Sequence, residues 1–150
     1  METYDFKLNA NEHCSFLIII LTFLGGYLMV KYSVLFINLA LLFYTIGVWS
    51  EKKQGELKKW HLAVFWVGLA FDTLGTTIMG KLAGQGFGLN FHSITGFLAI
   101  TLMLSHALWA TVVLIKNDKK AKANFHKLSI FVWLIWLFPF VSGAIYGMTR

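Results

Sequence analysis

The chain has 150 residues, of which 57% are hydrophobic and only 13% are charged, and its mean hydropathy is +0.66. A water-soluble domain carries about 25% charged residues, so this composition excludes a soluble catalytic domain and predicts that lipid surrounds much of the surface. The net charge of +6 does not indicate nucleic-acid binding, because nine of the thirteen Lys and Arg residues fall in two short segments between apolar runs, 52–59 and 116–127.

Five apolar stretches approach the length of about 20 residues that a helix needs to cross a hydrocarbon layer about 30 Å thick. In chain order they cover residues 16–30, 34–49, 60–79, 92–115 and 128–148. The first is short and only residues 31–33 separate it from the second, so the alternative is one kinked or re-entrant segment around Gly25 and Gly26. We expect an all-α, multi-pass membrane bundle of about five helices, with an N-terminal extension at 1–33 that adds one membrane helix and a four-helix core at 34–150.

The positions of the lysines predict how the helices cross the membrane. Short Lys-rich loops stay on the cytoplasmic side of a membrane, which places segments 50–59 and 116–127 inside. The glycine-rich connection 80–90 then lies outside. With five crossings of the cell membrane, the N-terminus is cytoplasmic and the C-terminus is outside.

Four of the five histidines lie in or at the ends of the apolar stretches: His61, His92, His106 and His126. Histidine is costly in a bilayer and usually faces the interior of a bundle or a polar partner. Three of the four directly follow an aromatic residue at the start of a stretch, and each of these alone also fits an interfacial residue with a hydrated ring. Four together in so small a chain favour a binding site.

His61 and His126 begin the third and fifth stretches from the same side of the membrane. Parallel helices at diagonal corners of a bundle leave room for a porphyrin, and two histidines can ligate its iron in a four-helix core. The segments that precede the two histidines also resemble each other, as in a parallel internal repeat or in any two cytoplasmic hairpins. No CxxCH motif is present, so the expected cofactor is non-covalent haem b, with His61 and His126 as the pair best matched in height.

His92 and His106 are second candidates for iron ligands. They are 14 residues apart on one helix, which puts them about 21 Å apart and within about 40° of the same face. Membrane b-type cytochromes hold two haems with such spacing, so one or two haems are expected. His92 has no histidine opposite it, although Met79 and Met148 end their stretches at that side.

Asp72 is a further candidate because a carboxylate inside a membrane span needs a partner. It follows His61 by 11 residues and therefore shares its helix face, within about 20°. Its expected depth matches that of His106. Two interpretations stay open: a structural or proton-carrying Asp72–His106 hydrogen bond, or a bond from Asp72 to the second ring nitrogen of an iron-bound His106.

Small residues accompany these faces of the third and fourth stretches. Gly68 and Gly75 share the face of His61 and Asp72, and Gly96 lies on the face of His92 and His106. Small residues let helices approach closely or leave a slot for a flat ligand. Helix packing is the commoner explanation.

Four segments carry a resemblance to a known family: LFYTIGVWSEKKQGELKKWH at 41–61, FDTLGT at 71–76, FHSITGFLAITLMLSHALWATVVL at 91–114 and FHKLSIFVWLIWLFPFVSG at 125–143. In these, and over about three quarters of its length, the chain resembles the haem-sensing membrane protein (HsmA) family of bacterial haem-sequestering proteins. The resemblance implies a multi-pass membrane protein that binds haem and limits haem toxicity. Residues 1–33 extend beyond the usual start of the family, and the ligands are not carried over from it.

Two other functions use the same residues. A b-type cytochrome or quinone-linked subunit of a larger membrane complex, or of a homo-oligomer, would have a redox role and would dock an acidic partner on its basic loops. A haem-free packing subunit would keep the histidines at the membrane interface. The partners expected from the sequence are haem, lipid and other membrane subunits.

Overall fold

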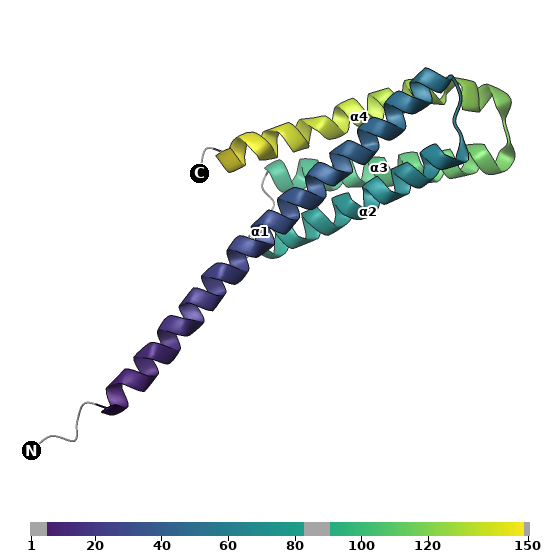
Figure 1. The fold of residues 1–150 in the computed structure, drawn as a ribbon. Coiled ribbons are helices and arrows are strands. Elements are labelled where there is room, and N and C mark those ends of the chain that lie inside the picture. The colour runs from purple at the N-terminus through teal and green to yellow at the C-terminus, as the bar shows by residue number, and fades with distance from the viewer. Residues whose placement is uncertain (1–5, 83–90, 149–150) are drawn as a thin grey trace, which may run out of the picture.

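The computed structural model describes residues 6–82 and 91–148, which form four helices (Figure 1). They are α1 (Phe6–Gln54), α2 (Lys59–Leu82), α3 (Phe91–Lys116) and α4 (Lys119–Met148). Each helix packs against the next one along the chain, and α4 packs against α1 to close the ring. Therefore α2 and α4 lie on one diagonal of the bundle and α1 and α3 on the other. All four are long and apolar enough to cross a membrane, and the chain is a helical membrane protein.

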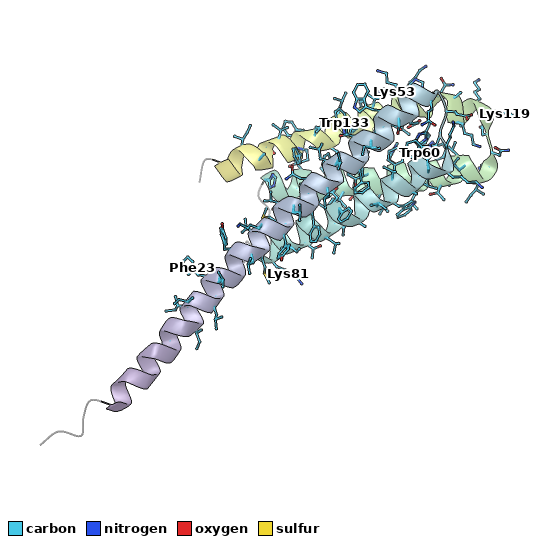
Figure 2. All side chains as sticks on the ribbon, in the orientation of Figure 1. Phe23, Lys53, Trp60, Lys81, Lys119 and Trp133 are labelled. Carbon is cyan, nitrogen blue, oxygen red and sulfur yellow. The ribbon has the colours of Figure 1, made fainter. Side chains whose placement is uncertain are left out.

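The expectation of five spans is wrong, because the first two predicted stretches belong to the single helix α1. Segment 25–33, which includes Gly25 and Gly26, contains no proline. A glycine inside a helix costs only about 1 kcal/mol. The 49 residues of α1 extend about 74 Å, more than twice the thickness of a hydrocarbon layer. The N-terminal half of α1 projects beyond the bundle (Figure 1), where the side chain of Phe23 is 80% exposed (Figure 2).

The number of helices also changes the expected topology. The placement of the two termini on opposite sides depended on five crossings. With four helices, α1 enters the bundle and α4 leaves it at the same end (Figure 1). If each helix crosses once, both termini lie on one side of the membrane.

Local sequence explains the turns at the other end, which we call the lysine end. Gly55 and Asn117 follow α1 and α3 with positive φ angles of 72° and 53°, the left-handed conformation that commonly ends helices. Asp118 starts α4 by accepting hydrogen bonds at Oδ1 from the backbone N–H groups of its first turn. The backbone N–H of Leu57 donates to the carbonyl of Lys122 at 3.2 Å. This bond joins the α1–α2 loop to the first turn of α4.

Both Lys-rich segments lie at this lysine end. Figure 2 shows Lys53 and Lys119 there and Lys81 at the opposite end of the bundle. The connection predicted to be glycine-rich and external, 80–90, lies mostly outside the described residues, except that residues 80–82 belong to α2. The lysines of the two segments 52–59 and 116–127 therefore form one polar cap at this end of the bundle.

Glycines bring α1 and α2 close together. A Cβ atom added to Gly68 would lie 2.7 Å from the ring of Tyr44, and one added to Gly75 would lie 2.6 Å from Ile37 and 3.0 Å from the carbonyl oxygen of Ser33. The alternative that Gly68 and Gly75 leave a slot for a flat ligand is wrong, because α1 fills the space. These glycines serve helix packing.

We expect Gly75→Ala to weaken the α1–α2 contact. The new methyl group would press on the backbone of Ser33 and Ile37, and overpacking of this kind costs about 1–3 kcal/mol. Gly96→Ala is the matched control, since a Cβ there meets no atom within 4 Å. Unfolding in mixed micelles should show a loss of stability for Gly75→Ala alone, and equal stabilities of the two variants would contradict the packing described here.

Candidate functional site

Asp72 lies in the middle of the bundle and is 4% exposed. Its Oδ2 accepts a hydrogen bond from the indole N–H of Trp136 on α4 at 2.8 Å and one from the hydroxyl of Tyr44 on α1 at 3.4 Å. The rings of Tyr44 and Trp136 also meet edge to face, with centroids 5.1 Å apart. Three helices therefore join at this carboxylate, which we call the central polar cluster (Asp72, Tyr44 and Trp136).

The predicted Asp72–His106 hydrogen bond is wrong. His106 lies beside Phe65 of α2, with ring centroids 4.9 Å apart, and Phe65 precedes Asp72 by seven residues, or about 10 Å along the helix. The sequence estimate placed His106 too deep because it assumed that both hairpins end at the same height. The Leu57–Lys122 bond shows instead that the α3–α4 turn extends past the α1–α2 loop.

His106 belongs to a second cluster nearer the lysine end, which we call the inner polar cluster (Glu51, Ser129 and His106). The hydroxyl of Ser129 on α4 donates to Oε2 of Glu51 on α1 at 2.5 Å and lies 3.5 Å from Nε2 of His106 on α3. All three side chains are buried. Phe65 and Phe125 contact the imidazole ring, so aromatic side chains flank the histidine of this cluster.

This inner cluster is incompletely hydrogen-bonded. Within the described residues, the buried side-chain nitrogen and oxygen atoms without a partner are Oε1 of Glu51, Nδ1 of His106 and Nε2 of His61. Buried polar groups normally find a hydrogen-bond partner, because a buried hydrogen bond that is left unmade costs about 1–3 kcal/mol. Unpartnered atoms on three helices at one end of the bundle therefore mark this end as the candidate site.

His61 is fully buried at the start of α2. Its Nδ1 accepts a hydrogen bond from the backbone N–H of Lys58 at 2.9 Å, as the third residue of a capping box does. The ring also contacts that of Trp60, with centroids 4.1 Å apart. Because Nδ1 accepts, a neutral His61 carries its proton on the unpartnered Nε2.

His126 is half-buried on α4. Its Nδ1 lies 3.1 Å from the carbonyl oxygen of Ala123, so Nδ1–H donates and the lone pair of Nε2 is free in the neutral ring. The backbone of Leu57 is hydrogen-bonded to that of Lys122. His61 follows Leu57 by four residues, and His126 follows Lys122 by four residues. Since α2 and α4 run in the same direction, the two histidines lie at similar depth on diagonal helices.

His92 differs from the other three because its side chain is exposed. Its ring lies over Gly143 of α4, 2.9 Å from where a Cβ atom would stand. Of the two methionines considered as its counterparts, Met79 accepts a hydrogen bond from Ser33 at 3.7 Å, and the side chain of Met148 lies outside the described residues. The contact of the His92 ring with Gly143 therefore helps to pack α3 against α4.

Sequence reasoning missed Glu51, which it assigned to a cytoplasmic loop. The available signal was the spacing of Ala40, Tyr44 and Val48, all buried, because Glu51 continues this helical face by three residues. Ser129 and Tyr44 were missed, and the bond from Trp136 to Asp72 was not predicted, because a single polar atom on an apolar helix does not reveal which helix it faces.

In the part of the chain that the structure describes, no group of three or more His, Cys, Asp or Glu side chains is arranged to hold a metal ion. Searches of family models, of curated proteins and of solved structures found no match to this chain.

Asp72→Ala should destabilise the bundle, because it leaves the Trp136 N–H and the Tyr44 hydroxyl without their acceptor. The expected loss is about 1–3 kcal/mol for each buried group left unpaired. Asp72→Asn retains an acceptor oxygen of the same shape and should lose clearly less. Unfolding of the purified variants in mixed micelles measures the difference, and identical losses would show that the two hydrogen bonds do not stabilise the fold.

Proposed function

We propose that this chain is an integral membrane protein that holds haem b between α2 and α4 near the lysine end and so limits haem toxicity. The observation that carries the proposal is the pairing of His61 and His126 at similar depth on diagonal helices. Two histidines on facing helices of a bundle can hold a haem group, and His61 and His126 on diagonal helices would be such a pair.

The hydrogen bonds of His126 support its role as a ligand. A histidine bound to a metal usually donates its other ring N–H to a carbonyl or carboxylate, which fixes the ring and leaves a lone pair for the metal. His126 has this arrangement through the carbonyl of Ala123.

His61 offers a buried Nε2 with no other partner. To bind iron through Nε2, its proton must move to Nδ1, and the cap on the backbone N–H of Lys58 is then given up. An ordinary hydrogen bond contributes about 1 kcal/mol, a small cost beside an axial iron bond. We therefore expect His61 to change tautomer when haem binds.

The surroundings suit the two parts of the haem molecule. Phe65 and Phe125 are buried at this end of the bundle and would face an apolar macrocycle. The exposed lysines of the adjoining cap, such as Lys52, Lys53 and Lys58, lie where the two haem propionates would reach water. Opposite charges at the polar edge would favour one orientation of the ring.

We also propose that the lysine end faces the cytoplasm, as the positive-inside rule favours, and that both termini lie outside the cell membrane. Haem produced or imported into the cytoplasm would then meet the site on its own side. The basic loops at that end offer an interface for an acidic partner.

Haem supplied during expression should give a purified protein with a Soret band. We expect His61→Ala and His126→Ala each to lose at least tenfold in bound haem per folded protein, because each removes one of the two side chains that would hold the iron. His92→Ala is the matched control, since its exposed ring takes no part in the proposed site. Haem-to-protein ratio and absorption spectrum are the measurements, with circular dichroism to confirm equal helix content.

Two outcomes would decide against this proposal. A folded wild-type protein without a Soret band would end it, and full haem loading in both His61→Ala and His126→Ala would move the site elsewhere. A low-spin haem that a quinol reduces rapidly would change the proposed role from sequestration to electron transfer.

A further inference from the structure

We propose that Ser129 connects His106 and Glu51 in a proton relay that crosses three helices inside the bundle. The relay uses neither His61 nor His126, the two haem ligands proposed above, and it goes beyond haem binding. It rests on the hydrogen bonds and the unpartnered atoms of the inner polar cluster.

The hydroxyl of Ser129 has one hydrogen and two lone pairs, which restricts the cluster to few arrangements. Its oxygen is 2.5 Å from Oε2 of Glu51, and its distances to Nε2 of His106 and to the carbonyl of Phe125 are 3.5 Å and 3.3 Å. The hydrogen therefore points to Glu51 when that carboxyl is ionised. Nε2 of His106 then donates to Ser129, and Nδ1 of His106 keeps a bare lone pair.

A proton that binds Nδ1 of His106 reverses every hydrogen bond in this chain. An Nδ1–H bond forms and the Nε2–H bond breaks as its proton passes to the oxygen of Ser129. The original hydroxyl proton of Ser129 passes to Oε2 of Glu51. The products are neutral His106 with its proton on Nδ1, an unchanged serine and a protonated Glu51, so one proton has been taken up and none is lost.

The two ends of this relay are the atoms that lack partners. Nδ1 of His106 and Oε1 of Glu51 are both buried and unpaired in the described part of the chain. A cluster that served stability alone would have these atoms satisfied, because buried polar networks contribute most when complete. Open ends are what a relay requires, since a proton must arrive at one end and leave from the other.

The central polar cluster provides an internal contrast. Asp72 is also buried, yet its closest donor is the indole N–H of Trp136 at 2.8 Å, which donates but does not accept. The hydroxyl of Tyr44 lies farther from this carboxylate, at 3.4 Å. A proton cannot pass through an indole as it can through a hydroxyl. The closest contact of Asp72 therefore holds its carboxylate in place, whereas the closest contact of Glu51 is a hydroxyl that also reaches the imidazole of His106.

No cation neutralises Glu51 among the residues that the structure describes. The ion pair found there joins Lys58 to Glu56 at 3.9 Å, and the amino group of Lys122 donates to Asn117. The other titratable groups at this end of the packed helices include His61 at the start of α2 and His126 and Lys127 on α4, and Tyr44 and Asp72 lie deeper in the bundle. Lys52 and Lys53 follow Glu51 on α1 with exposed side chains. The proton that the relay delivers therefore neutralises the negative charge of the buried Glu51 carboxylate.

The test uses the full chain without haem, labelled with ¹⁵N-histidine, in lipid bilayers. The ¹⁵N shifts of His106, assigned with His106→Gln, report which ring nitrogen carries the proton. The infrared C=O band of Glu51, assigned with Glu51→Gln, reports protonation of the carboxyl. We expect His106 to switch from the Nε2–H to the Nδ1–H tautomer at the same midpoint pH at which Glu51 becomes protonated.

Ser129→Ala should abolish this tautomer switch, because the connection between the two groups is removed. Ser129→Thr restores a hydroxyl and should restore the switch, and Asp72→Asn, a buried carboxyl outside the cluster, should leave it unchanged. The relay is overturned if His106 keeps one tautomer throughout the titration of Glu51 in the wild type, whatever the variants do. An unaltered switch in Ser129→Ala would overturn it as well. Neither readout involves a Soret band, so this inference and haem binding can fail separately.

Discussion

Lipid offers no hydrogen bonds, so a polar group buried between these four helices can be paired only by a partner within the protein. This constraint explains the core better than apolar packing does, because lipid solvates leucine as well as a helix neighbour would. The carboxylate of Asp72 collects donors from α1 and α4. Ser129 likewise links α4 to α1 through Glu51. Each cluster thus fixes the relative position of at least three helices.

The close approach of α1 and α2 is the second element of the design. With glycines under Tyr44 and Ile37, the two helices touch along most of α2, and Tyr44 is carried to Asp72. By contrast, α1 and α4 meet over a short length, and their contact relies on the polar clusters and on the indole of Trp133 donating to Thr45 at 3.3 Å. The tightly packed pair α1 and α2 is therefore joined to α4 mainly through hydrogen bonds.

Much of this arrangement could be predicted from the sequence, and the predictions that failed did so for definable reasons. Length and hydropathy predicted the last three helices, and the two lysine segments do lie at one end of the bundle. The prediction of a separate first span was wrong. A short polar break without proline does not end a helix when the residues before and after the break are apolar and lipid can solvate them. The partner of Asp72 was wrong because helical periodicity gives the face of a residue, whereas its depth depends on how far each hairpin extends. Glu51 was missed because a charged residue beside lysines resembles a loop until its burial is known.

The distribution of unsatisfied atoms indicates where function resides. In the middle of the bundle, Oδ2 of Asp72 accepts hydrogen bonds from a tryptophan and a tyrosine, and no atom of Asp72 is among the buried atoms without a partner, which fits a structural role. Near the lysine end, two imidazoles and a carboxylate each keep one atom unpaired among aromatic rings. Folding alone would favour replacing such a set by apolar residues, since buried charged and polar groups stabilise a fold poorly. That this end retains them, next to the only polar cap on the described bundle, is the physical reason for expecting ligands and protons to enter there.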